Sequence, residues 1–114
     1  MTDCLFCKIA RKEIPSSVVY EDEKVIAFKD INPAAPVHIL IITKQHIESA
    51  LSINTTNSSL IAHIFEIAAD IAKEQGVADD GYRIVTNIGK DGGQTIAHIH
   101  FHLLGGRDLQ WPPG

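Results

Sequence analysis

Residues 98–104 read His98-Ile99-His100-Phe101-His102-Leu103-Leu104, and this stretch decides the fold. Apolar residues alternate with histidines, which predicts a strand from Ile96 to Leu104. Because successive side chains of a strand point to opposite faces, the three histidines share one face and the apolar residues share the other. The apolar face is expected to anchor the strand in a core, so that the imidazoles lie on a rigid element.

Three imidazoles at a spacing of two residues indicate a reactive site. Burying three titratable rings without a function would cost several kcal/mol of desolvation. Histidine accepts phosphoryl groups well near neutral pH, because its ordinary pKa of about 6.5 leaves the free base available. We therefore expect His100 to be a nucleophile on a nucleoside phosphoryl group, with a neighbouring histidine protonating the leaving group. A metal site made of all three is less favoured, because such side chains start about 6–7 Å apart on the backbone.

A loop rich in glycine precedes the histidine strand, with the sequence Asn87-Ile88-Gly89-Lys90-Asp91-Gly92-Gly93-Gln94-Thr95. Glycines permit positive φ and close approach of the backbone, so consecutive amides can turn towards one phosphate, and Thr95 adds a hydroxyl donor. Asp-Gly-Gly is also an ordinary hairpin turn. The position directly before the histidines favours phosphate binding, although no Walker ending of Gly-Lys-Ser/Thr is present.

The remaining elements follow from local patterns. We expect a short helix around Leu5–Ile9, a hairpin of strands 17–21 and 25–29, a buried strand over 38–43 and another strand over 82–88. Apolar residues at helical spacing predict a long helix from Asn57 or Ser58 that Gly76 ends. Short connections between strands favour an α+β architecture with an antiparallel sheet of about five strands.

Composition sets the class of protein. At 114 residues and 45% hydrophobic, the chain fits a single domain over residues 1–114. A domain of this size can bury apolar surface against a copy of itself, so a homodimer is expected. The net charge of -4 and the scattered basic residues disfavour nucleic acid as a partner. The start Met1-Thr2-Asp3-Cys4 has no targeting pattern and no apolar stretch reaches membrane-spanning length, so we expect a cytoplasmic protein without membrane contact.

The histidine stretch, the tail Gly105-Gly106-Arg107 and Trp111-Pro112-Pro113-Gly114 together resemble the histidine-triad (HIT) proteins, in particular the Hint branch. The likeness covers nearly the whole chain, including residues 4–9, 28–31, 35–38 and 91–94. It implies a homodimer whose two five-stranded antiparallel sheets join into one of ten strands. It also implies hydrolysis of adenosine 5'-phosphoramidates and aminoacyl-adenylates to AMP through a nucleotidyl-histidine.

The resemblance also assigns site residues by position. His100 is the nucleophile, and His102 and His38 contact the phosphate and the leaving group. The other implied nucleotide-binding residues are Asp30 for the ribose, Phe6, Ile9, Phe28 and Ile31 for the base, and Asn87, Gly93, Gln94 and Thr95 around the phosphate. Thr95 replaces a serine common in Hint proteins and keeps the hydroxyl. Trp111 lies in a tail that reaches the partner's active site in this branch, although its own pattern suggests a frayed end.

The two cysteines, Cys4 and Cys7, are interpreted as metal ligands or redox thiols, because structural disulfides are rare in a reducing cytosol. Their C-x-x-C spacing offers two thiolates to zinc, which needs two more ligands for a tetrahedral site. The resemblance to bacterial HIT proteins implies His46 and His98 as those ligands, which makes His98 structural. A redox pair or free thiols are the alternatives. His63, in the long helix, is expected to have no catalytic role.

The leading hypothesis is therefore a hydrolase acting on a phosphorus-nitrogen bond of a purine nucleoside monophosphate. Cleavage of dinucleoside polyphosphates, as in the Fhit branch, is one alternative. A nucleotide-binding interaction module with vestigial activity is another.

Overall fold

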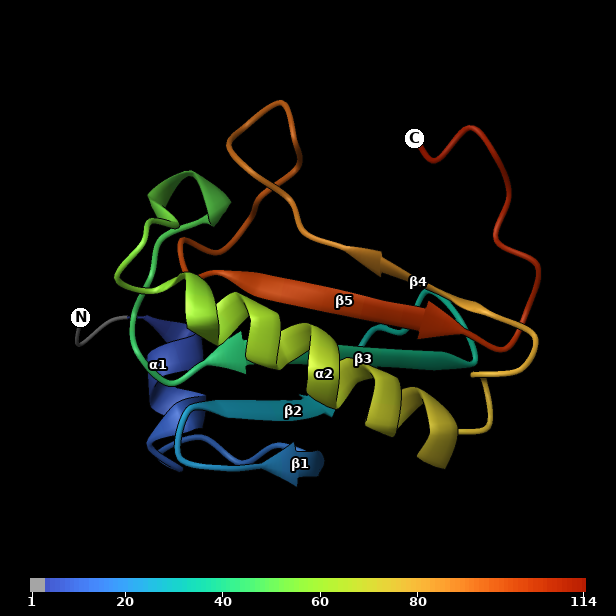
Figure 1. Ribbon diagram of the computed structural model, residues 1–114, viewed down its shortest axis with the longest axis horizontal. Coiled ribbons are helices and arrows are strands. Elements are labelled where there is room, and N and C mark those ends of the chain that lie inside the picture. Colours follow the sequence, from blue (N-terminus) through green and yellow to red (C-terminus); the bar gives the residue numbers. More distant parts are fainter. Residues whose placement is uncertain (1–3) are drawn as a thin grey trace.

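The computed structural model describes residues 4–114, and these form a five-stranded sheet with two α-helices. The elements are α1 (Leu5–Ala10), β1 (Val18–Glu21), β2 (Val25–Lys29), β3 (Val37–Thr43), a 3₁₀ turn (Ala50–Ser52), α2 (Ser58–Glu74), β4 (Tyr82–Val85) and β5 (His100–Gly105). All neighbouring strands are antiparallel, in the order β1-β2-β3-β5-β4. The expected α+β architecture is confirmed, and Figure 1 shows β1 and β4 at the two edges.

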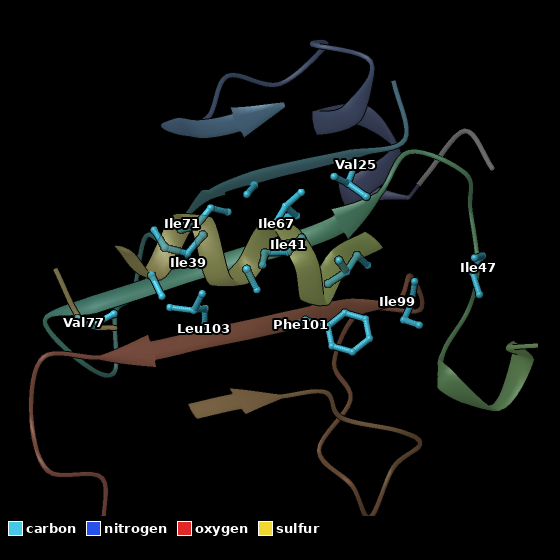
Figure 2. Close-up of a cluster of buried hydrophobic side chains, with 14 residues drawn as sticks. Val25, Ile39, Ile41, Ile47, Ile67, Ile71, Val77, Ile99, Phe101 and Leu103 are labelled. Atoms are coloured by element: carbon cyan, nitrogen blue, oxygen red, sulfur yellow. The ribbon is translucent and has the colours of Figure 1, made fainter. Parts of the chain in front are cut away.

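Alternation along β3 and β5 separates the sheet into two faces. Ile39 and Ile41 of β3 and Phe101 and Leu103 of β5 belong to the core cluster that includes α2. Helix α2 lies across this face in Figure 1, and Figure 2 shows its Ile67 and Ile71 near the strand side chains. The intervening residues point to the other face, where α1 packs. His100 and His102 lie opposite Ile42 and Leu40 in the register, so both histidines are on the α1 face.

The long helix α2 has the expected bounds and burial. Its residues Ile64, Ile67, Ala68 and Ile71 are buried, which confirms the apolar stripe predicted from the helical spacing. The helix ends at Glu74, and Gly76 follows with φ of +76°, a conformation that glycine adopts without strain. Phe65 on the same helix is only partly covered, with 49% of its surface exposed.

The last two strands of the chain, β4 and β5, are shorter than predicted. β5 begins at His100 instead of Ile96, because the amide of Ile99 donates to Ile47 O at 2.6 Å and the amide of His98 donates to Ile96 O at 2.9 Å. β4 ends at Val85 instead of Ile88. There the Thr86 hydroxyl donates to His100 O at 2.8 Å, so a side chain satisfies the carbonyl in place of the ladder.

None of the helices within residues 4–114 is long and apolar enough to cross a bilayer. Residues 1–3, on which the expectation about the start of the chain partly rests, lie outside the described residues.

Candidate active site and metal centre

The sheet brings three of the predicted site histidines together. His100 and His102 come from β5 and His38 from the adjacent β3. The His100 and His102 ring centroids are 5.2 Å apart, and those of His38 and His102 are 5.1 Å apart. His38 and His100 are buried, with 8% and 6% of their surface exposed. The triad expected from sequence is therefore a compact group of imidazoles in which His38 takes the place of His98.

One nitrogen of His100 is fixed by the backbone. Its Nδ1 lies 2.7 Å from the carbonyl oxygen of His98, which has no hydrogen to give, so Nδ1 donates. In the neutral ring the proton is then on Nδ1 and the lone pair is on Nε2. His100 is thus held in the tautomer that a nucleophile requires.

The other two histidines form a chain of hydrogen bonds with the opposite result. The backbone amide of Ala34 donates to His38 Nδ1 at 3.0 Å, so the proton of neutral His38 is on Nε2. This Nε2 lies 2.9 Å from His102 Nδ1 and 3.4 Å from Asp30 Oδ2. With His102 Nδ1 accepting, its proton is on Nε2. His102 therefore presents an N–H donor, whereas His100 presents a lone pair.

Burial keeps this histidine pair uncharged. Desolvation, together with charge repulsion from the neighbouring His100 and His38 rings, lowers the pKa of His102 to about 4. Desolvation also lowers the pKa of His38, although the Asp30 carboxylate opposes that effect. Both rings are neutral near pH 7, as the hydrogen-bond chain from Ala34 requires.

A pocket of about 700 Å³ lies on the α1 face, and two of its lining residues contact the histidine group: Phe6 packs against His100, and Asp30 lies 3.4 Å from His38. It is lined by every residue expected to bind the nucleoside, namely Phe6, Ile9, Phe28, Asp30 and Ile31, and by Thr95. Ile31 is 91% exposed and lies at the rim, whereas Phe6, Ile9 and Phe28 are buried in the wall. Asp30 Oδ1 accepts from the Asn32 amide at 2.8 Å, which orients the carboxylate.

The glycine loop is braced by its own side chains. Asn87 Nδ2 donates to Gly92 O at 2.7 Å. Gln94 accepts from the Gly89 amide at 3.0 Å and donates to Glu48 O at 2.7 Å. Asn87 and Gln94 therefore order the loop, while Thr95 borders both the nucleoside pocket and a smaller hollow beside Gly93.

The glycines themselves are required here. A Cβ on Gly92 would lie 2.2 Å from Ile88 O, and Gly93 has φ of +82°. The loop backbone can follow this path only because neither residue has a side chain.

A second hollow of about 600 Å³ adjoins the other side of the triad, lined by His38, His102, Asn87, Arg83, Arg107 and the tail. Arg83 donates to the carbonyls of Leu109 and Gln110 at 2.9 and 3.0 Å. Arg107 donates to Ala34 O at 2.9 Å. The tail is therefore held in place and is not frayed as its pattern suggested, although Trp111 is 79% exposed. Sequence reasoning missed both arginines, because nothing in their local sequence indicates these long-range bonds.

The four predicted zinc ligands also meet. Cys4 Sγ lies 3.4 Å from His98 Nδ1, and Cys7 Sγ lies 3.2 Å from His46 Nδ1 and 3.5 Å from His98 Nδ1. All four ligand atoms lie within 4.8 Å of one another. A tetrahedral zinc with bonds of about 2.3 Å to sulfur and about 2.05 Å to nitrogen would separate those ligands by about 3.6 Å. The cluster therefore fits a zinc site.

The His98 ring is oriented for this role. Its Nε2 donates to Thr43 O at 2.7 Å, so the lone pair is on Nδ1 and faces both sulfurs. Burial lowers the pKa of His98 to about 4, although the Thr43 carbonyl opposes the shift. Burial likewise raises the pKa of the Cys7 thiol, with the Cys4 thiol adding to the rise. A carbonyl that fixes the far nitrogen of a histidine is the usual support of a metal ligand.

His63 lies away from both groups. Its Nε2 is 2.6 Å from Asp22 Oδ2, and Tyr20 also donates to that oxygen, at 2.7 Å. These bonds join α2 to the β1–β2 hairpin.

Known proteins are similar to this chain in sequence and in fold. A family model described as "Scavenger mRNA decapping enzyme C-term binding" matches residues 3–110. The chain is 46% identical over 107 residues to the purine nucleoside phosphoramidase of Escherichia coli (strain K12), covering 94% of this chain and 90% of that protein. It is 50% identical over 112 residues to the 14 kDa zinc-binding protein of Zea mays, covering 96% and 87%. The crystal structure of a HIT family hydrolase from Legionella pneumophila superposes with a TM-score of 0.96 at 51% identity, covering 98% of this chain and 100% of that one.

The site combines a group of hydrogen-bonded histidines on an antiparallel sheet with a nearby cluster of two cysteines and two histidines. Together these features define the class of histidine-triad hydrolases. The chain belongs to the histidine-triad (HIT) family, and its cysteine–histidine cluster and zinc-binding relative confirm the Hint branch.

Proposed function

We propose that this chain hydrolyses purine nucleoside phosphoramidates and aminoacyl-adenylates, releasing AMP through a covalent nucleotidyl-His100 intermediate. The observation that carries the proposal is the bond from His100 Nδ1 to His98 O, which leaves a lone pair on a rigidly held Nε2. The similarity to the purine nucleoside phosphoramidase of E. coli supports the choice of substrate.

The two histidines have complementary roles in the proposed reaction. His100 Nε2 attacks the α-phosphorus, a P–N bond forms to the enzyme, and the bond to the leaving group breaks. That group is the amine of a phosphoramidate or the carboxylate of an aminoacyl-adenylate. His102 Nε2–H is the donor available to that amine, with His38 and the Ala34 amide holding its tautomer. Water then attacks phosphorus and gives a proton back to His102 Nε2, the bond to His100 breaks, and AMP leaves with both rings restored.

The pockets supply the binding sites in this proposal. The base and ribose occupy the pocket lined by Phe6, Ile9, Phe28 and Asp30, and Ile31 covers its rim. Asn87, Gly93, Gln94 and Thr95 hold or order the phosphate, and the leaving group extends towards the hollow beside His102. Cys4, Cys7, His46 and His98 would hold a zinc ion. This ion would have a structural role, joining four separate residues of the chain, and would take no part in the reaction.

Trapping the intermediate tests the mechanism. Acid-free quenching during turnover of an adenosine phosphoramidate, followed by peptide mass spectrometry, should find one AMP adduct on the peptide containing His100. Nucleotide binding without any adduct or turnover would instead identify an interaction module. Rates measured side by side with diadenosine tri- and tetraphosphate decide between phosphorus-nitrogen and polyphosphate cleavage, and we expect the phosphoramidate to react faster.

We also propose that the protein is a homodimer in which Trp111 of one protomer reaches the site of the other. Phe65 on α2 and Trp111 are among the exposed apolar side chains that such an interface could cover. Light scattering should give twice the 12.5 kDa mass of one chain. A mass of 12.5 kDa at micromolar concentration would contradict it.

A further inference from the structure

Helix α1 belongs to both the metal cluster and the nucleoside pocket. Cys4 caps its N-terminus, with its Sγ accepting from the Cys7 amide at 3.4 Å, and Cys7 lies within the helix. Two other residues of the same helix, Phe6 and Ile9, line the nucleoside pocket. A helix of six residues is far below the roughly 12–15 residues at which isolated helices become marginally stable. The position of this pocket wall therefore depends on what holds the helix at its ends.

His98 forms a second connection between the two sites. Its ring nitrogens are directed to the cysteines and to Thr43, while its backbone carbonyl accepts the bond from His100 Nδ1. The edge of the Phe6 ring also contacts both rings, with centroids 5.9 Å from His98 and 5.0 Å from His100. A backbone shift at His98 that opens the metal cluster would therefore also move the acceptor that orients the nucleophile.

We propose that metal binding at Cys4, Cys7, His46 and His98 and nucleotide binding in the adjoining pocket are reciprocally coupled, each strengthening the other. The inference rests on the proposed nucleotide site. A ligand against Phe6 and Ile9 holds α1 where the cysteines meet the histidines, and a metal ion holds α1 where Phe6 and Ile9 meet the ligand. Thermodynamic linkage requires that both affinities change by the same factor.

The direct test uses the wild-type, zinc-loaded protein. Calorimetry first measures AMP binding, and zinc affinity is then measured by competition with a chelator of known affinity, with and without saturating AMP. We expect AMP to tighten zinc binding about tenfold. AMP's own weak affinity for zinc acts in the opposite direction, so it cannot imitate this result.

The outcomes separate the two proposals. If AMP fails to bind the zinc-loaded protein, the proposed function fails and the coupling fails with it. If AMP binds but zinc affinity rises by less than about fivefold, the lower end of the usual range of allosteric coupling, the coupling alone is overturned. The matched control is Asp30→Ala, which should weaken AMP binding without changing a residue of α1. In this variant a higher AMP concentration should be needed to give the same increase in zinc affinity.

The reciprocal measurement uses Cys4→Ser. If this variant folds, its AMP dissociation constant should rise several-fold. Exact equality of the two factors applies to the wild type with and without zinc, because the substitution also changes the cap of α1. An unchanged AMP affinity in the folded, zinc-free variant overturns the inference. If the variant does not fold, the chelator competition on the wild type decides alone.

Discussion

The molecule contains two groups of histidines: His46 and His98 in the metal cluster, and His38, His100 and His102 in the active-site group. The two groups differ in what their ring nitrogens contact. In the metal cluster, His98 directs Nδ1 at two sulfurs and donates through Nε2 to Thr43 O. In the active-site group, His38 and His102 contact each other and His100 contacts a carbonyl. His98 and His100 are only two residues apart, so the same residue type acquires a metal-binding or a reactive role from its partners.

The difference shows that the role of each histidine depends on which ring nitrogen is fixed by a hydrogen bond. Alternation along the strand does not determine that role. His98 is fixed at Nε2 and offers Nδ1, whereas His100 is fixed at Nδ1 and offers Nε2. His98 lies just before the β5 ladder, and its ring faces the two cysteines on the same side of the sheet as His100. Variants in the two groups should therefore have separable effects.

The largest effect is expected from His100→Ala. Removing the proposed nucleophile should lower kcat by about 10⁴-fold or more, which corresponds to about 5.5 kcal/mol. AMP affinity should stay within about tenfold, or 1.4 kcal/mol, because most of the nucleoside pocket is intact. Single-turnover kinetics and calorimetry measure the two quantities. The zinc content should be unchanged, and a fully active variant would rule out the mechanism.

Cys7→Ser should affect the other group. Loss of one thiolate from a buried cluster should lower zinc content from near one per chain and lower the free energy of unfolding by several kcal/mol. Metal analysis and thermal unfolding measure these effects. His102→Gln is the matched comparison and should keep its zinc. Equal zinc content in Cys7→Ser and the wild type would exclude Cys7 as a ligand.

Much of this comparison was predictable from the sequence. The C-x-x-C pair and the period-two histidines indicated both kinds of chemistry, and the spacing of Ile64, Ile67 and Ile71 predicted α2. The tautomers of His38, His102 and His98 were not predictable, because they depend on Ala34 and Thr43, whose backbone groups approach the histidines only in the folded chain. The start of β5 was predicted wrongly for the same reason, since the Ile99 amide bonds to Ile47 from a distant loop.

His102→Gln should lower kcat by about 10²-fold, because the proposed donor to the leaving amine is lost. It should also flatten the dependence of stability on pH. Wild-type His102 has a pKa lowered from 6.5 to about 4, so between these values the unfolded state binds more protons than the folded state. The stability of the wild type should therefore fall as pH drops from 6.5 towards 4.

Chemical denaturation at pH 7 and pH 4.5, with zinc present, measures this slope. The glutamine variant should lose less stability than the wild type over that interval, since it has no imidazole to protonate at position 102. Identical slopes would mean that His102 is not held neutral by its burial.

The smallest effect, and the one that tests how separate the two groups are, is expected from Phe6→Leu. Phe6 is 3% exposed and lies edge-on to His98, His100 and Phe28. Leucine keeps the apolar contact but loses these edge contacts, so the free energy of unfolding should fall by about 1 kcal/mol. AMP affinity should weaken a few-fold, while zinc stoichiometry stays near one.

The control for Phe6→Leu is Ile64→Val, a fully buried position on the α2 face that should cost a similar free energy of unfolding, about 1 kcal/mol. Because Ile64 lies across the sheet from both groups, that variant should bind AMP as the wild type does. If the two variants lose stability equally and neither changes AMP affinity, Phe6 is only a core residue. A change in AMP affinity confined to Phe6→Leu would instead show that the wall between the two histidine groups also belongs to the nucleotide site.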